Sequence, residues 1–203
     1  MSFSIIQIIA ADIYVNGSGN ANTYTTIQEA VDSAASGDNI YVATVGTYSE
    51  NVTISNKTLF IMAAVADEQF TLSGAFTLNP GSGNEVTIIG MYNGNIDVQT
   101  YSYGTINLIS CFISSIDADT YGSLKVNVYD CEVSNDFIIS SGSVKGCTIL
   151  GELNITNSNG AASDTIRIMG NYLEDRIYWN SNTCYFEICN NFIKMNNNGQ
   201  SYA

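Results

Sequence analysis

A repeat of about 20 residues in the second half of the chain restricts its possible folds more than any other feature. Six segments share one pattern: apolar, polar, apolar, any residue, a small or polar residue, and then a turn position. The turn positions recur at intervals of 20, 20, 16, 24 and 20 residues. They are Met91, Cys111, Cys131, Cys147, Asn171 and Asn191. A period of this length is typical of stacked structural units, so a single closed sheet is not expected.

Alternation within the segments predicts that each unit begins with a β-strand whose side chains point alternately inward and outward. The inward set is Val86, Ile88, Ile106, Leu108, Val126, Val128, Gly142, Val144, Ile166, Ile168, Phe186 and Ile188. The outward set is Thr87, Asn107, Asn127, Ser143, Arg167 and Glu187. We expect Ile88, Leu108, Val128, Val144, Ile168 and Ile188 to form one buried stack.

A second short strand is predicted after each turn, at 96–98, 116–118, 137–139, 153–155 and 177–179. Several short strands per repeat, joined by bends, predict an all-β fold, a right-handed parallel β-helix of about seven coils. A leucine-rich repeat would need its spaced leucines, and a propeller blade would need about 40 residues.

The first third of the chain predicts a helix over residues 25–37. Ile27, Ala30, Val31 and Ala34 are spaced so that they share one apolar helical face. The expected caps are Thr25 or Thr26 at the N-terminus, Gln28 or Glu29 in a capping box, and Gly37 in the left-handed position after the last turn. Strands are expected to follow at 39–43, 51–54 and 57–63.

These predictions give a single β-helix domain over residues 1–203. It comprises an N-terminal arm or strand (1–24), a capping helix (25–37), the coils (38–195) and a polar tail (196–203). The last coil lacks a second amphipathic helix, so we expect a further domain, a neighbouring subunit or a host particle to cover it. The arm Met1–Ala11, with its apolar run, is a candidate for the partner side of such a contact.

Residues 23–54, TYTTIQEAVDSAASGDNIYVATVGTYSENVTI, resemble the cap and first coil of the pectin-lyase-like right-handed parallel β-helix superfamily. The resemblance implies that Gly37 and Asp38 turn the chain into the first strand and that Gly46 and Tyr48 close the first bend. It also implies an asparagine ladder at the turn positions. Asn171 and Asn191 fit that ladder, whereas the middle coils carry cysteine there.

Enzymes of that superfamily are mostly pectate lyases, polygalacturonases, pectin methylesterases and alginate lyases, so the resemblance implies polysaccharide substrates. The chain departs from them because it has no histidine, which polygalacturonase-like sites use. No methylesterase-like set of glutamine, aspartates and arginine matches position by position. A lyase-like site would need a cationic base beside acidic Ca²⁺ ligands, and Arg167 is the only outward cation on the first face. Its expected neighbour Glu187 favours a surface ion pair.

The charge distribution narrows the range of partners. The formal net charge is −13, and the six basic residues are scattered singly. Nucleic-acid binding is therefore not expected, because no basic stripe can neutralise phosphates. The apolar run near the N-terminus is too short to insert into a membrane. Cations, including Ca²⁺, are the expected charged ligands, and no other cofactor is predicted.

Three sets of residues are candidates for a site. Asp97, Asp117 and Arg167 are the catalytic candidates, and Asp97, Asp117 and Asp119 are the Ca²⁺ candidates, with a solvated acidic face as the alternative. Tyr92, Phe112, Tyr172 and Phe192 follow the turn in four coils and are expected either to stack on sugar rings or to pack around the turns. Tyr101, Tyr103 and Tyr121 are expected in bends.

The turn-position cysteines are expected to be free thiols that pack as small apolar residues, because stacked Cβ vectors disfavour a disulfide. Reduced thiols in such a fold favour synthesis in a reducing cytoplasm and a later location on a virion surface or outside the cell. The expected function is a non-enzymatic structural or surface-binding module, such as a phage or virion surface, decoration or spike-like protein. The expected partners are protein subunits of a larger assembly, or glycans. The alternative is a polysaccharide-active enzyme, a lyase or hydrolase of acidic glycans, or a degenerate relative of one.

Overall fold

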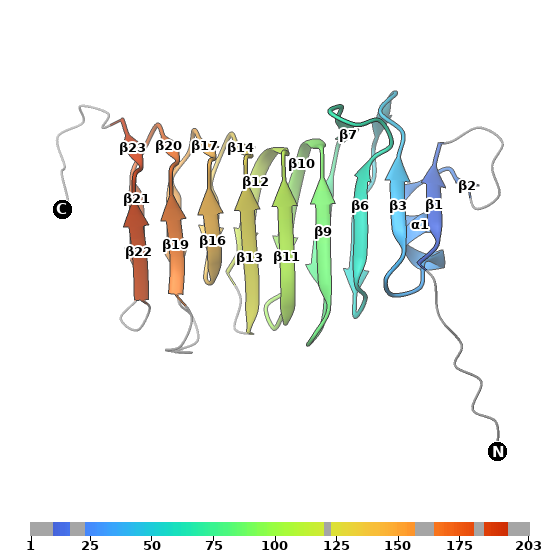
Figure 1. Ribbon diagram of the computed structural model, residues 1–203, viewed down its shortest axis with the longest axis horizontal. Coiled ribbons are helices and arrows are strands. Elements are labelled where there is room, and N and C mark those ends of the chain that lie inside the picture. Colours follow the sequence, from blue (N-terminus) through green and yellow to red (C-terminus); the bar gives the residue numbers. More distant parts are fainter. Residues whose placement is uncertain (1–9, 17–22, 120–122, 157–164, 181–184, 195–203) are drawn as a thin grey trace, which may run out of the picture.

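The chain folds as a right-handed parallel β-helix of about seven coils, as the repeat predicts. A computed structural model describes residues 10–16, 23–119, 123–156, 165–180 and 185–194. Strands from successive coils lie side by side along the long axis, and one short helix lies near the N-terminal end (Figure 1). No helix in the described part of the chain has the length and apolar character needed to cross a bilayer.

Each complete coil contributes one strand to a sheet that runs the length of the solenoid, here called sheet A. Every strand pair in it is parallel and in register, so similar side chains stack from coil to coil. In spatial order its strands are β2 (Thr23–Tyr24), β1 (Asp12–Val15), β3 (Asn39–Val42), β6 (Leu59–Ala63), β9 (Glu85–Ile89), β11 (Gly104–Ile109), β13 (Leu124–Tyr129), β16 (Gly142–Lys145), β19 (Thr165–Met169) and β22 (Tyr185–Cys189). β1 and β2 extend the sheet before the first complete coil, and β22 extends it after the last.

The return path of the coils forms the second sheet, sheet B. It contains short strands that follow the turn, β4 (Thr47–Tyr48), β7 (Phe70–Leu72), β14 (Glu132–Val133), β17 (Thr148–Ile149), β20 (Tyr172–Leu173) and β23 (Phe192–Ile193). It also contains the next strands along, β5 (Val52–Ser55), β8 (Ala75–Asn79), β15 (Phe137–Ile139), β18 (Leu153–Thr156) and β21 (Ile177–Asn180). β10 (Met91–Val98) and β12 (Phe112–Ala118) continue through both positions and join them.

The core lies between the two sheets. Leu108 pairs with Ile88 in the preceding coil and with Val128 in the next, and all three side chains are fully buried. The stack continues through Val144 and Ile168, as predicted, but its last member is different. Ile188 is 42% exposed, because no strand among the described residues follows β22.

Two other positions depart from the alternation. Thr87, expected to face outward into solvent, is only 5% exposed and accepts a hydrogen bond from Asn107 Nδ2 at 3.2 Å. Gly142 begins β16 with φ +124, and a Cβ atom there would lie 1.9 Å from the Val126 carbonyl oxygen. The strand therefore starts on glycine for steric reasons, and Gly142 adds no side chain to the core.

Each strand of sheet A from β9 onward ends in a bend whose first residue has a left-handed backbone. These residues are Gly90, Ser110, Asp130, Gly146, Gly170 and Asn190, with φ between 51 and 72°. Glycine, asparagine and aspartate tolerate this conformation best, which explains why the repeat carries a small or polar residue just before the turn position.

The turn positions form a hydrogen-bonded ladder along the solenoid. Asn191 Nδ2 donates to the Ile168 carbonyl at 2.8 Å, and Asn191 Oδ1 accepts from the Asn171 N–H at 2.9 Å. Asn171 makes the same two bonds one coil earlier, to the Val144 carbonyl at 3.0 Å and from the Cys147 N–H at 2.9 Å. Both asparagines therefore satisfy backbone groups that the bend leaves unpaired.

The cysteines take the same role as the asparagines. Cys131 Sγ donates to the Leu108 carbonyl at 3.5 Å and accepts from the Cys111 N–H at 3.3 Å. Cys111, Cys131 and Cys147 are buried free thiols, as predicted. In addition to packing as small apolar residues, each thiol donates a hydrogen bond to a backbone carbonyl of the preceding coil. The pKa of Cys131 is raised by its hydrogen bonds with the neighbouring thiols and by burial, so this thiol stays protonated and unreactive at neutral pH.

The capping helix is shorter than predicted. α1 spans Ile27–Ser33, with a capping box between Thr26 and Glu29, and ends four residues before Gly37. The helix stops early because Ala34 has an extended backbone. Lys57 Nζ donates hydrogen bonds to the Val31 and Ala34 carbonyls at this end of the helix. Gly37 is left-handed, as expected, but it lies in the turn after the helix instead of at its C-terminus.

Asp38 explains the turn that follows the helix. Its carboxylate is buried and accepts hydrogen bonds from the Ala11 and Ala35 N–H groups, both at 2.8 Å. The side chain thus connects β1, the end of α1 and the start of β3. The apolar face of α1 packs on the first coils, where Ile13 and Val15 are buried. Figure 1 shows α1 beside β1 and β3 at this end.

Candidate functional site

Two carboxylates are stacked on the outer face of sheet B. Asp97 on β10 and Asp117 on β12 pair in register, and both side chains are exposed. The pKa of Asp97 is raised, first because part of the carboxyl group is removed from water and second because Asp117 repels its charge. The sequence prediction that these two residues adjoin in consecutive coils is confirmed.

The raised pKa gives a pH prediction. A carboxyl whose folded pKa lies above its unfolded value destabilises the fold when ionised, and this penalty is lost as the pH falls through the folded pKa. We expect Asp97→Asn to melt a few degrees or less above the wild type at pH 7. The gap should close as the pH falls towards the ordinary aspartate value of 3.8.

The check is a set of melting curves from pH 7 to pH 3, together with an NMR titration of the Asp97 carboxyl carbon. Asp117→Asn is the matched control, because it removes the repulsion and should lower the Asp97 pKa. An Asp97 pKa unchanged in that control would contradict the part of the shift assigned to repulsion by Asp117.

Asp119 does not join this pair as a third ligand. Its N–H donates to Asp117 Oδ1 at 3.3 Å, while its own carboxylate accepts from the Thr156 hydroxyl at 2.9 Å. No three acidic or cysteine side chains among the described residues are arranged to hold a metal ion. The expected Ca²⁺ set is therefore not assembled by these three residues.

The same column of sheet B continues past the aspartates. Asp117 pairs with Ile138, which pairs with Asn154, so Asn154 lies two coils on, as predicted. The Asn154 Oδ1 atom is buried without a hydrogen-bond partner in the described structure. Ile138 lies between the amide and the carboxylates, so Asn154 adds nothing to the acidic pair.

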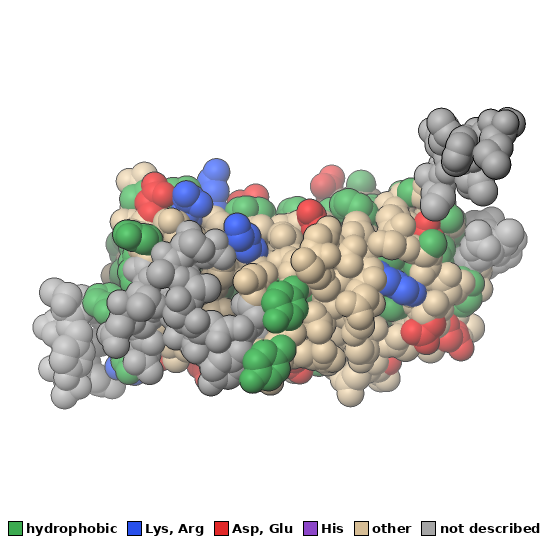
Figure 2. Space-filling model, turned by 90° about the horizontal axis from the view of Figure 1, so that it is seen from below, with side chains coloured by type: hydrophobic (Ala, Val, Ile, Leu, Met, Phe, Trp, Pro, Cys, Tyr) green, Lys and Arg blue, Asp and Glu red, His purple; other side chains and the backbone are tan. Residues whose placement is uncertain are grey.

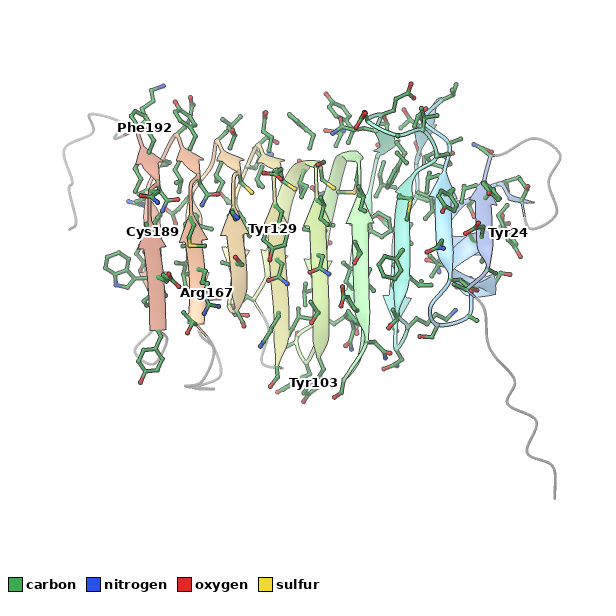
Figure 3. The ribbon with its side chains drawn as sticks, in the orientation of Figure 1. Tyr24, Tyr103, Tyr129, Arg167, Cys189 and Phe192 are labelled. Carbon is green, nitrogen blue, oxygen red and sulfur yellow. The ribbon has the colours of Figure 1, made fainter. Side chains whose placement is uncertain are left out.

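Arg167 is not brought to the aspartates. It lies on β19 in sheet A, and Figure 3 places it on the outer face several coils from β10. Arg167 Nε is 3.0 Å from Glu187 Oε2, and both side chains are about half exposed. An exposed pair of this kind contributes less than about 1 kcal/mol to stability. The structure shows the expected ion pair, and it separates Arg167 from the paired catalytic candidates Asp97 and Asp117.

The four aromatic residues after the turns form two pairs. Tyr92 stacks on Phe112 with ring centroids 4.9 Å apart, and Tyr172 stacks on Phe192 at 5.4 Å. Glu132 and Thr148 separate the pairs, because they occupy this register position in the two coils between Phe112 and Tyr172. The predicted coil spacing is correct, but the aromatic column is interrupted.

The bend tyrosines are a third aromatic feature. Tyr101 and Tyr103 are 67% and 44% exposed, and Figure 3 shows Tyr103 at the lower edge of the solenoid. Tyr121 lies outside the described residues. Figure 2 shows the lower face as a mostly uncharged polar surface with isolated charged and hydrophobic groups. Such a surface offers hydroxyl and amide groups for contacts, with no dominant charge.

The last described coil has the most distinctive surface. Its inward positions carry core-type residues, yet Trp179 is 50% exposed, Phe186 37% and Ile193 40%. The residues that precede them in register, Ile155, Ile166 and Leu173, are fully buried. The four exposed residues Trp179, Phe186, Ile188 and Ile193 form an apolar surface, here called the C-terminal end face.

The sequence alone predicts only part of the end face. The repeat predicts a last coil with inward Phe186 and Ile188 and no helix over it. It does not predict that Trp179, the chain's single tryptophan, shares that face, because this requires the register of β21 against β18. The polar tail and most of the N-terminal arm, the candidate for the partner side of such a contact, lie outside the described residues.

No family model, no curated protein and no solved structure matches the chain.

Proposed function

We propose that this chain is a non-enzymatic structural module that binds other protein subunits through its C-terminal end face. The observation that carries the proposal is the contrast between neighbouring coils: Ile168 is fully buried, whereas its partner in the next coil, Ile188, is 42% exposed. A terminal repeat that only met water would need a polar outer side. An exposed apolar surface flanked by open strand edges is typical of an association site.

The fold and the thiols suggest where such a module works. Stacked coils present repeated surfaces on a rigid scaffold. The resemblance of residues 23–54 to pectin-lyase-like β-helix proteins supports a common origin with that superfamily. Reduced buried thiols are compatible with synthesis in a reducing cytoplasm. A phage or virion surface, decoration or spike-like protein would combine these properties. The fold alone is shared by many functions, so the proposal depends on the end face.

The test uses Trp179 as a reporter on the end face. Proteins encoded by neighbouring genes would be purified, in forms that lack tryptophan, and titrated into the chain. Acrylamide quenching of Trp179 fluorescence would then be measured in each complex. The proposal expects capsid or tail genes nearby, and at least one product that protects Trp179 and no longer binds Ile188→Glu. Neighbouring polysaccharide-utilisation genes, with no product that protects Trp179, would overturn it.

A polysaccharide-active protein is the second candidate. The stacked pair Tyr92 and Phe112 lies on the same two strands, β10 and β12, as Asp97 and Asp117. Aromatic faces and carboxylates together suit sugar rings, and a raised aspartate pKa suits a general acid. Because the chain's net charge of −13 repels acidic glycans, Ca²⁺ would have to bridge them.

This alternative is decided by binding and cleavage assays on acidic and neutral polysaccharides with and without Ca²⁺. Phe112→Ala should abolish binding if β10 and β12 form the site, whereas Tyr172→Ala serves as the matched control on the second aromatic pair. Activity that survives a triple substitution of Asp97, Asp117 and Arg167 would exclude those three as the site.

A further inference from the structure

The end face has open strand edges as well as apolar side chains. In sheet A, β22 pairs only with β19 among the described strands. In sheet B, β21 and β23 are likewise the final strands of their rows. Their unpaired N–H and C=O groups can accept another strand, so an occupant that also supplies strand edges would satisfy both the backbone and the apolar surface.

Charge makes this end different from the rest of the chain. Residues 165–194 contain three basic and three acidic residues, so they carry no net charge, although the whole chain carries −13. The ion pairs of this region include Arg167 with Glu187 and Lys194 with Glu174. Two copies of such a strongly acidic protein repel each other, and the repulsion is smallest where the C-terminal ends meet.

The N-terminal end of another copy does not fit this face. α1 lies over that end, and its outer side carries the exposed acidic residues Glu29 and Asp32. Placing these carboxylates against Trp179 and Ile188 would remove charges from water without a partner. A head-to-tail filament is therefore disfavoured, whereas two C-terminal end faces match each other in their apolar character and low net charge.

We propose that two copies of this chain associate tail to tail about a two-fold axis, with each C-terminal end face covering the other. The proposal deepens the proposed function and depends on it, because it names a second copy as a subunit that the end face binds. With the two-fold axis perpendicular to sheet A, strand direction is reversed, so β22 of one copy would lie antiparallel to β22 of the partner. A single coil end is small for a protein interface, so we expect a dissociation constant on the order of micromolar.

The experiment is sedimentation velocity over a wide concentration range, with acrylamide quenching of Trp179 measured on the same samples. The wild type should change from monomer to dimer as its concentration rises, and the quenching of Trp179 should fall in parallel. Ile188→Glu should raise the dissociation constant about 100-fold or more, since each substitution enters the interface twice. Val45→Glu is the matched control, because Val45 is 84% exposed and far from the end face, and it should leave the dimer unchanged.

Other outcomes identify another occupant. A monomer at every concentration that becomes a dimer when the chain is shortened to end at Lys194 would show that residues 195–203 cover the face, and the inference would be wrong. Open-ended polymers would also contradict it, because a two-fold contact closes at two copies. If no self-association occurs but a different subunit still protects Trp179, this inference fails and the proposed function stands. If Ile188→Glu changes neither self-association nor the binding of a different subunit, both this inference and the proposed function fail.

Discussion

Leu108→Asp is expected to prevent folding, whereas Ile109→Asp, one residue further along β11, is expected to leave the protein folded. Leu108 is fully buried between Ile88 and Val128, so an aspartate there would be an unpaired charge in an apolar stack. Its burial costs several kcal/mol, comparable with the whole stability of an ordinary domain, about 5–15 kcal/mol. Ile109 faces outward and is half-buried, so its carboxylate remains hydrated and should cost about 1 kcal/mol.

Soluble yield, far-ultraviolet circular dichroism and thermal melting of the two variants check this prediction. The pair is informative because the same chemical change is made at adjacent positions, and only the strand register distinguishes them. A soluble Leu108→Asp protein that melts like the wild type, or a reversed order of the two variants, would refute the register of sheet A.

Asn171→Leu should have the second-largest effect, a loss of about 3 kcal/mol. The asparagine is 3% exposed, accepts from the Cys147 N–H and donates to the Val144 carbonyl. Leucine would leave both backbone groups buried without a partner, at about 1–3 kcal/mol each. Urea unfolding, followed by the shift in midpoint, measures the loss.

Asn171→Cys is the matched variant for the ladder. The preceding coils show that a thiol makes the same two bonds, at longer distances, as Cys131 does to the Leu108 carbonyl and from the Cys111 N–H. We therefore expect Asn171→Cys to cost about 1 kcal/mol, clearly less than leucine. Equal losses in the two variants would show that the ladder bonds do not stabilise the turns.

Much of the fold could be predicted from sequence because each coil of a solenoid contacts mainly the coils directly before and after it in the chain. The spacing of the turn positions determines which residues stack, so Ile88, Leu108 and Val128 could be aligned without knowing the path between them. The left-handed bends were visible only as a preference for small or polar residues. The end of α1 was placed too late, since the extended backbone at Ala34 and the contact from Lys57 depend on tertiary structure.

The candidate sites were harder to predict because they depend on neighbours across different elements. The stacking of Asp97 on Asp117 followed from the repeat, but the hydrogen bond that draws Asp119 to Thr156 did not, since Thr156 lies 37 residues away. The sequence alone relates Arg167 to the aspartates only through its charge, and the structure places it in a different sheet. The end face became complete only when the register of β21 added Trp179.

Hydrogen–deuterium exchange of the wild-type chain at low concentration is the most direct measurement of the central claim. The claim is that α1 covers one end of the solenoid and that the last described coil, at the other end, is exposed. Exchange depends on the local opening of backbone hydrogen bonds. The account predicts slow exchange in β9, β11 and β13, similar protection in β1 and β3 beneath the helix, and fast exchange in β21 and β22. At high concentration, β22 should become protected. Protection of β22 equal to that of β11 in the dilute monomer would contradict the open end face.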